Sequence, residues 1–175
     1  MKAFQPEATV LIVPGLRGHV ADHWQTLLAE GLEKVVTVPP LDSDTLSCQA
    51  RVEAIAQTLE RIDGPVILVA HSAGVLMVAH WVAQQGATRC RYSIRGALLV
   101  TPPDLDASWP SHYPSAHAMQ AGGWHPLPRM KLPFSSLVVM SHNDPLASPE
   151  AVRALALDWG SELVDAGAVG HLNPA

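Results

Sequence analysis

Ser72 lies at the junction between two apolar segments of the 175-residue chain. The segment before it, residues 65–69, is short and rich in β-branched side chains, which is typical of a buried strand. The segment after it, residues 75–85, contains no helix breaker and predicts a buried helix. A serine on the sharp turn between a strand and a helix is a nucleophile elbow, which exposes the hydroxyl and leaves the amide of the next residue, Ala73, free to bind an oxyanion.

A serine hydroxyl needs a base to take its proton and a third group to orient that base. Where such an elbow occurs, the partners follow in the chain order serine, acid, histidine, on loops after later strands. Asp144 follows an apolar segment at 136–141, and His171 follows a shorter one at 161–165. We therefore expect Ser72, Asp144 and His171 to form a catalytic triad.

Two other aspartates compete with Asp144 for the role of the acid. Asp104 follows the apolar segment 95–101 and meets the same order rule, so it stays open as an alternative, unless it is only a turn residue at the surface. Asp165 ends a predicted strand only six residues before His171, which favours a structural role.

An oxyanion hole requires a second amide besides that of Ala73, and the loop after the first strand should supply it. Residues 14–18 directly follow the apolar segment 9–13, so the amide of Leu16 is the candidate. The glycines on either side of Leu16 allow the backbone to approach a substrate oxygen. An ordinary strand-to-helix turn explains the same residues equally well. A phosphate-binding loop does not, because the dinucleotide fingerprint and the P-loop lysine are both missing.

The stretch from residue 102 to residue 134 interrupts the regular pattern of the chain. It holds seven of the fifteen prolines and is too long for an ordinary connection, so we expect a functional loop or a small cap, with a short helix near 115–120. Trp109, Tyr113 and Trp124 could line a substrate pocket there, or could form a cluster that only holds the loop down. His19, beside the proposed oxyanion loop, is a further candidate for contact with the substrate.

Short apolar segments alternate with helical patterns throughout the chain. The expected strands are 9–13, 35–38, 65–69, 95–101, 136–141 and 161–165. The expected helices run from the N-cap candidate Asp22, with Gln25 three residues on as in a capping box, to about residue 32, and across 52–62, 75–85 and 149–159. This alternation predicts a three-layer α/β/α sandwich in a single domain, residues 1–175, with a mainly parallel, six-stranded, doubly wound sheet covered on both faces. The binding crevice of such a sheet lies at the carboxyl ends of its strands.

Composition narrows the classes of partner and compartment. Hydrophobic residues make up 48% of the chain and charged residues 15%, as in a globular domain. The formal net charge of −5 argues against nucleic acid or an anionic membrane as a partner. No apolar run is long enough for a transmembrane helix, and the first residues lack the features of a signal peptide. Cys48 and Cys90 are far apart, so we expect a reduced, cytoplasmic protein, with one long-range disulfide as the alternative. The oligomeric state is not indicated.

Nine histidines raise the question of a metal site. His112, His117 and His125 fall in the proline-rich stretch, but no zinc pattern fits them and neither cysteine is near. We therefore expect no metal and no organic cofactor. His71 is expected to point away from the serine hydroxyl and to support the turn, and His23 is expected to start a helix.

These motifs together resemble a known family. Four motifs carry the resemblance. They are the Pro-Gly loop at 14–15 followed by His-Trp-Gln at 23–25, the Ala-His-Ser-Ala-Gly elbow at 70–74, the Asp-Pro pair at 144–145, and the Gly-His-Leu-Asn segment at 170–173. Their order and spacing resemble small single-domain serine hydrolases, the relatives of retinoblastoma-binding protein 9 and of the bacterial YdeN-like proteins.

The resemblance implies a reduced α/β-hydrolase fold that lacks the first two strands of larger enzymes, with the triad on Ser72, Asp144 and His171. It also implies a final helix after the histidine, whereas this sequence ends at Ala175, which would leave His171 on a terminal segment that frays. Larger hydrolases usually have glycine where Ala70 stands, so the elbow is expected to be tight.

The expected reaction is hydrolysis of a small-molecule ester, thioester or amide through an acyl-enzyme on Ser72. Two alternatives remain open: an acyltransferase that uses the same acyl-enzyme, and a protein-binding module that keeps the scaffold with little turnover. The physiological substrate and the acyl chain length are not indicated.

Overall fold

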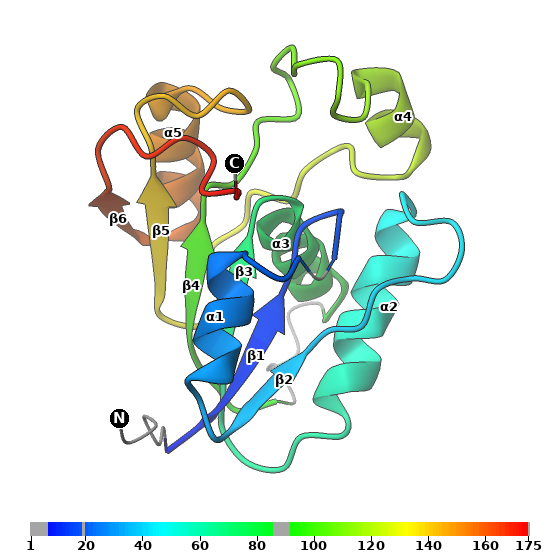
Figure 1. The fold of residues 1–175 in the computed structure, drawn as a ribbon, viewed down its shortest axis with the longest axis vertical. Helices are drawn as coiled ribbons and strands as arrows, with labels where there is room; N and C mark the ends of the chain where they lie inside the picture. Colours follow the sequence, from blue (N-terminus) through cyan, green and yellow to red (C-terminus); the bar gives the residue numbers. More distant parts are fainter. Residues whose placement is uncertain (1–6, 19, 86–91, 175) are drawn as a thin grey trace.

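The computed structural model describes residues 7–18, 20–85 and 92–174. Within them, six parallel strands form one sheet in the order β2-β1-β3-β4-β5-β6 (Figure 1). The strands are β1 (Thr9–Val13), β2 (Val35–Thr37), β3 (Val66–His71), β4 (Ile94–Val100), β5 (Ser136–Met140) and β6 (Glu162–Asp165). The strand order changes direction between β1 and β3, and ligands of open α/β sheets bind beyond the carboxyl ends of the strands at such a point. The predicted parallel, doubly wound sheet is confirmed.

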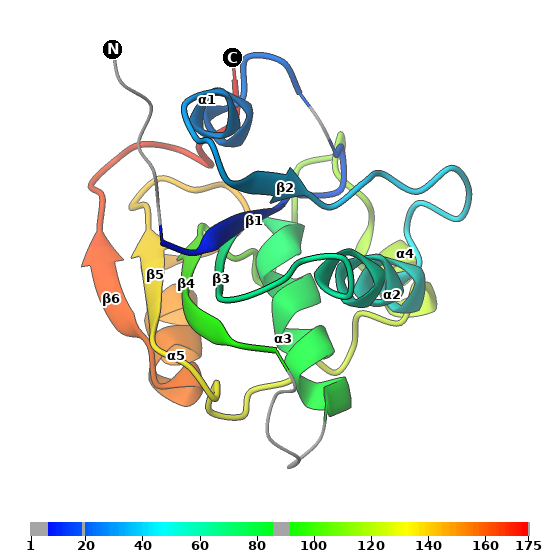
Figure 2. The ribbon, with the colours of Figure 1, turned by 90° about the horizontal axis from the view of Figure 1, so that it is seen from below.

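The helices cover the two faces of the sheet unequally. They are α1 (Trp24–Glu30), α2 (Cys48–Leu59), α3 (Ala73–Gln85), α4 (Ala116–Ala121) and α5 (Pro149–Trp159). Figure 2 shows α1 on one face of the sheet and α2, α3 and α5 on the other.

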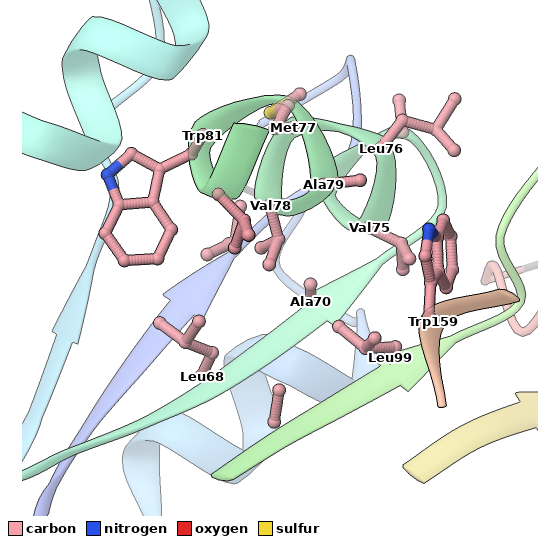
Figure 3. Close-up of a cluster of buried hydrophobic side chains, with 14 of the residues drawn as sticks. Leu68, Ala70, Val75, Leu76, Met77, Val78, Ala79, Trp81, Leu99 and Trp159 are labelled. Atoms are coloured by element: carbon pink, nitrogen blue, oxygen red, sulfur yellow. The ribbon is translucent and has the colours of Figure 1, made fainter. Parts of the chain in front are cut away.

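The main core lies on the face that carries three helices. Its centre is α3, an almost wholly apolar helix, which packs on β3 and β4 through residues such as Val75 and Leu99 (Figure 3). Trp81 and Trp159, at 0% and 1% exposure, belong to this same cluster. The α3 helix therefore has a fixed position under the end of β3, where Ser72 follows.

Helices lie on both faces, as the sequence analysis expected, but α1 covers only part of its face. A small buried cluster of Val10, Ile12 and Val69 lies under α1. Farther along the sheet, Leu137 of β5 and Val164 of β6 are 39% and 38% exposed. The strand alternation places both on the face opposite the buried Val138, and no helix of the described chain packs there.

Helix α1 begins differently from the prediction. His23, not Asp22, is the N-cap, because its Nδ1 accepts the backbone N–H of Gln25 at 3.2 Å. The Gln25 side chain is buried and does not close a capping box. Its Nε2 donates to the carbonyl oxygens of Val13 at 3.3 Å and Val69 at 3.0 Å, near the carboxyl ends of β1 and β3. The glutamine thereby ties α1 to the edge of the sheet that carries Ser72.

Helix α2 begins at Cys48, earlier than predicted, because Ser47 supplies an N-cap whose Oγ accepts the N–H of Ala50 at 3.1 Å. Cys48 is a free, buried cysteine, and burial raises the pKa of its thiol to about 11. Cys90 lies outside the described residues. Among the helices of the described chain, none has the length and apolar character needed to cross a membrane.

Candidate active site

Ser72 occupies the turn between β3 and α3. Its φ of 56° lies in the left-handed region that residues other than glycine rarely adopt. Two backbone hydrogen bonds hold this conformation: the N–H of Ser72 donates to Val100 O, and the N–H of Val75 donates to Ser72 O, both at 2.9 Å. A strained residue persists only where its surroundings determine its conformation, and such residues cluster at functional sites.

Gly74 explains why the elbow needs small residues. A Cβ at this position would lie 2.3 Å from the carbonyl oxygen of Val13 and 2.7 Å from that of Pro14, so no side chain fits. Gly15 lies close to Ser72 itself, because a Cβ added at Gly15 would lie 3.3 Å from Ser72 Cβ. The loop after β1 therefore lies directly against the serine turn.

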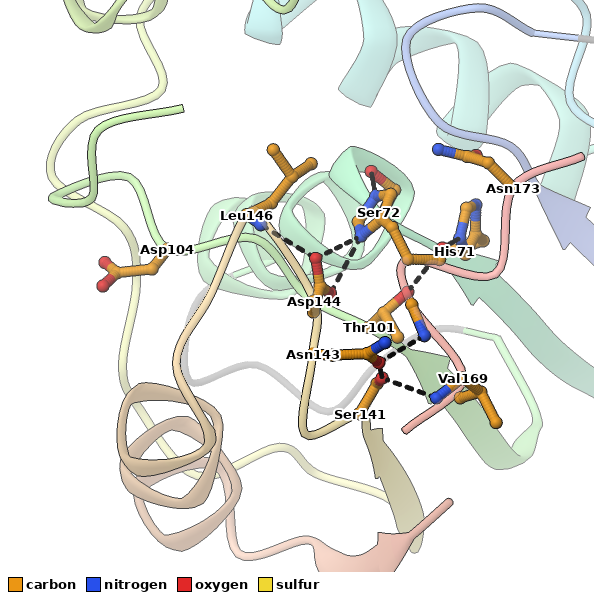
Figure 4. Close-up of polar contacts among 12 residues, drawn as sticks. His71, Ser72, Thr101, Asp104, Ser141, Asn143, Asp144, Leu146, Val169 and Asn173 are labelled. Carbon is orange, nitrogen blue, oxygen red and sulfur yellow. Dashed lines mark hydrogen bonds and ion pairs between the residues drawn. The ribbon is translucent and has the colours of Figure 1, made fainter. Parts of the chain in front are cut away.

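Ser72, His171 and Asp144 form one hydrogen-bonded line (Figure 4). Nε2 of His171 lies 2.7 Å from Ser72 Oγ, and its Nδ1 lies 2.9 Å from both carboxylate oxygens of Asp144. The side chains of His171 and Asp144 are only 4% and 2% exposed. Because a carboxylate only accepts, Nδ1 carries the ring proton and Nε2 is left to accept from the serine hydroxyl. This is the tautomer that a general base needs.

The other two aspartates make different contacts. The carboxylate of Asp104 accepts the backbone N–H of Asp106 at 3.0 Å, and Figure 4 shows it directed away from the line. The carboxylate of Asp165 binds Nε2 of His142 at 2.8 Å and the N–H of Gly167 at 2.9 Å. Neither of them contacts the ring of His171 within the described structure, so the geometry favours Asp144.

The loop that carries His171 is held by two polar side chains that the sequence analysis did not single out. The N–H of Gly170 donates to Asn143 Oδ1 at 2.7 Å, and the N–H of Val169 donates to Ser141 Oγ at 3.2 Å. Both side chains come from the segment just after β5 that also carries Asp144. A short polar run directly after a buried strand was the signal that could have identified them.

His71 points away from the serine hydroxyl and supports the site from behind. Its Nε2 lies 2.8 Å from the carbonyl oxygen of His171, and since a carbonyl only accepts, this nitrogen carries the proton. The ring is 2% exposed and packs against the rings of His23 and His171. Burial lowers the pKa of His71 to about 3, so the imidazole stays neutral near pH 7 and adds no positive charge beside the base.

The two oxyanion candidates, Leu16 and Ala73, both line the cavity beside Ser72. Ala73 is the first residue of α3, where backbone N–H groups have no acceptor within the helix. The loop at Leu16 is anchored by the buried Arg51, whose Nη2 donates to Leu16 O at 3.0 Å and whose Nε donates to Thr45 O at 2.7 Å. An arginine at helical spacing with the apolar residues Val52, Ile55 and Leu59 of the buried face was the available sequence signal for this anchor.

A cavity of about 530 Å³ opens beside Ser72 at the carboxyl ends of the strands. Trp109 and Tyr113, from the proline-rich stretch, form part of its lining. Trp109 Nε1 donates to Asp104 O at 2.8 Å, and Tyr113 Oη accepts from Asn173 Nδ2 at 3.2 Å. The stretch 102–134 contains the short helix α4 and contributes one wall of the cavity.

Trp124 does not line the cavity, contrary to the expectation. It is fully buried in the core, and its Nε1 donates to Leu46 O at 2.8 Å. The carbonyl oxygen of Trp124 lies 3.0 Å from Nε2 of His80, a residue of α3, so Trp124 packs beside that helix. His19 lies outside the described residues. In the part of the chain that the structure describes, no three His, Cys, Asp or Glu side chains form a group that could hold a metal.

Comparisons with known proteins agree with this geometry. A family model described as "Serine hydrolase" matches residues 10–175. A solved structure of a YdeN-like hydrolase from Pectobacterium atrosepticum is 32% identical, with a TM-score of 0.70 over 95% of this chain and 80% of that one. The search of curated proteins found no match.

Two more distant solved structures have a similar fold. The ydeN gene product of B. subtilis is 17% identical, with a TM-score of 0.66 over 94% of this chain and 88% of that one. Est1E from Butyrivibrio proteoclasticus, solved with ferulic acid bound, is 14% identical, with a TM-score of 0.67 over 94% of this chain and 81% of that one. At these identities the likeness concerns the α/β-hydrolase fold alone.

Proposed function

The chain belongs to the serine hydrolase family, and on that premise we propose that it cleaves an ester, a thioester or a small amide through an acyl-enzyme on Ser72. The observation that carries this proposal is the hydrogen-bonded line from Ser72 through His171 to Asp144. The cavity beside the serine, with its partly apolar lining, supports a small-molecule substrate.

In the proposed reaction, Ser72 Oγ attacks the carbonyl carbon of the substrate while its proton passes to His171 Nε2, which lies 2.7 Å away. Asp144 keeps Nδ1 protonated and stabilises the imidazolium that forms. The amides of Leu16 and Ala73 bind the oxyanion of the tetrahedral intermediate, a kind of contact whose loss typically costs about a hundredfold or more in rate.

Collapse of the intermediate breaks the bond to the alcohol, thiol or amine, which leaves with the proton from Nε2. The acyl group stays on Ser72. A water molecule then gives a proton to Nε2 and attacks the acyl carbon, and the acid is released as the proton returns to the serine oxygen. The scheme uses only side chains and amides of this chain and one water.

A fluorophosphonate probe, which reacts with activated serines, tests the nucleophile. We expect stoichiometric labelling of the wild-type chain at Ser72, found by peptide mass spectrometry, and no labelling of Ser72→Ala. Ser108→Ala, a change at an exposed serine of the long loop, is the matched control and should label normally.

Turnover of short 4-nitrophenyl esters separates an enzyme from a binding module on the same scaffold. We expect hydrolysis by the wild-type chain and a loss of about a thousandfold or more in kcat for His171→Ala. Labelling that survives Ser72→Ala, or ester cleavage that survives both substitutions, would contradict the proposal.

A further inference from the structure

The residues that line the cavity beside Ser72 differ in charge from the rest of this acidic protein. The chain carries 16 aspartate and glutamate residues and a net charge of −5, yet none of the described residues that line the cavity is an aspartate or a glutamate. The lining does include the permanent cation of Arg17, together with His23, His71 and His112. A neutral substrate would need no such exclusion of carboxylates.

Arg17 stands on the loop that carries the oxyanion candidate Leu16. Its side chain is exposed, and it forms no ion pair with any carboxylate of the described chain. Arg51, on the other side of the same loop, is different: it is buried, and its Nε and Nη2 already donate to two backbone carbonyls. The guanidinium of Arg17 is therefore available to a bound ligand.

The charge of Arg17 reaches the histidines behind the serine. Burial lowers the pKa of His23, and the positive charges of Arg17 and His171 lower it further. Burial likewise dominates at His71, where Arg17 acts in the same direction. No carboxylate opposes these effects at either ring. Arg17 is therefore close enough to the rings of His23 and His71 for its charge to act on them.

The wall from the proline-rich stretch is apolar and flat. Trp109 and Tyr113 present aromatic rings to the same cavity, and three prolines complete this apolar part of the lining. Aromatic and proline side chains can pack against a short acyl or aryl group without many rotatable bonds to restrict. The cavity therefore combines an apolar wall with a single cation.

Resting on the proposed function, we infer that the substrate carries a carboxylate, separated from the scissile carbonyl by a short apolar group, and that Arg17 binds this carboxylate. A guanidinium offers a planar pair of N–H donors that matches one carboxylate with two parallel hydrogen bonds. The apolar group between the two ends packs on Trp109 and Tyr113. Arg17 is in this scheme the residue that determines specificity for charge.

Two matched pairs of esters test the inference. Mono(4-nitrophenyl) glutarate and its methyl ester differ by one charge on the acyl side. 4-Acetoxybenzoate and its methyl ester differ by one charge on the leaving-group side. The measured quantity is the ratio of kcat/KM for the anionic ester to kcat/KM for the neutral ester, compared between variants so that the intrinsic reactivity of each ester cancels.

In at least one pair, we expect this ratio to fall about tenfold in Arg17→Gln, as is usual for loss of a charge-assisted hydrogen bond, and to fall further in Arg17→Glu. Arg17→Lys should retain most of the ratio. Arg153→Gln, at a surface arginine of α5 that pairs with Glu150, is the matched control and should keep the wild-type ratio. Added salt should lower the ratio in the wild-type chain, in Arg153→Gln and in Arg17→Lys, which all keep a cation at position 17, and should leave it unchanged in Arg17→Gln.

A ratio that changes less than twofold in Arg17→Gln for both pairs overturns the inference, while hydrolysis of the neutral esters leaves the proposed function standing. An equal loss for anionic and neutral esters overturns it as well, since Arg17 would then act only on the shape of the oxyanion loop. A wild-type chain that cleaves none of the four esters and takes no fluorophosphonate overturns both proposals.

Discussion

The two sides of the candidate site are built in different ways. On one side, Ser72, Asp144 and His171 follow three parallel strands of one sheet, β3, β5 and β6, and the bonds between them are 2.7 to 2.9 Å long. On the other side, Trp109 and Tyr113 stand on a proline-rich loop, are partly exposed, and each make a polar contact, of 2.8 Å and 3.2 Å. The sheet fixes the three hydrogen-bonded side chains, whereas the loop forms part of the cavity wall beside them. Changes on the first side should abolish turnover, and changes on the second should alter substrate preference.

The largest effect is expected at the acid. Asp144→Asn replaces an acceptor with a group whose amide can donate, so His171 loses the partner that keeps its proton on Nδ1. We expect kcat to fall about ten-thousandfold with little change in melting temperature. Asp104→Asn is the matched control and should stay within about threefold of wild type, since that carboxylate bonds only a local amide. Equal losses in both variants would mean that the geometry assigns the acid wrongly.

A backbone change on the same side should act through stability. Gly74→Ala forces a Cβ against two carbonyl oxygens of the loop after β1, at 2.3 and 2.7 Å before any relaxation. We expect the free energy of unfolding to fall by about 3 kcal/mol or more, measured by urea denaturation. Gly31→Ala has its nearest contact at 3.5 Å and a negative φ, so it should leave stability within about 1 kcal/mol of wild type.

The buried imidazole of His71 should make stability depend on pH. Its pKa is about 3 in the folded chain, against 6.5 for an ordinary histidine, so between these values the unfolded chain binds more protons. Stability from this group is therefore complete above pH 6.5 and is lost as the pH falls toward 3. Between pH 7 and pH 5, we expect the wild-type free energy of unfolding to fall by about 2 kcal/mol more than that of His71→Gln.

Glutamine keeps an amide donor near the position of Nε2 but does not titrate, which isolates the protonation of His71. Other buried histidines, including His23, are present in both proteins and cancel in the comparison. Parallel stability curves for the wild type and His71→Gln across this pH range would show that the ring does not stay neutral in the folded chain.

The smallest effect is expected in the cavity wall. Trp109→Ala enlarges the cavity, so the preference between 4-nitrophenyl butyrate and acetate should shift by about fivefold to tenfold, measured as the ratio of kcat/KM values. Trp124→Phe removes a buried indole that lies outside the cavity, so it should lower the melting temperature and leave that ratio unchanged. If Trp124→Phe shifted the butyrate-to-acetate ratio as much as Trp109→Ala does, the ratio would not report the shape of the cavity wall.

Sequence patterns predicted that Ser72, Asp144 and His171 lie together, because a simple geometric rule governs their position. Parallel strands end at one edge, so residues just after them meet there even when they are far apart in the chain. Ser72 and His171 are separated by 99 positions, yet the rule places them together. The loop wall obeys no such rule, and Trp124, which the same reasoning placed beside Trp109, turns into the core instead.

Capping patterns were a weaker guide for a similar reason. Asp22 and Gln25 fit the spacing of a capping box, but the structure uses His23 as the cap and buries Gln25 between the ends of β1 and β3. Two carbonyl groups at that edge need donors, and a buried unsatisfied carbonyl is more costly than a missing cap. The need for donors at these two carbonyl groups arises only when the strands have paired in the folded sheet, so the local sequence does not show it.

By itself, the sequence determined the succession of strands and helices, the serine turn, the histidine and two candidate acids, Asp144 and Asp104, because periodicity and chain order are local or topological properties. The tertiary structure alone decided which polar groups hold the line in place and which side chains line the cavity. Arg51, Asn143 and His71 bond to backbone atoms that are distant in the chain, and Arg17 lines a cavity whose described lining residues include no aspartate or glutamate. These relations depend on how loops fold over the edge of the sheet, which no short pattern encodes.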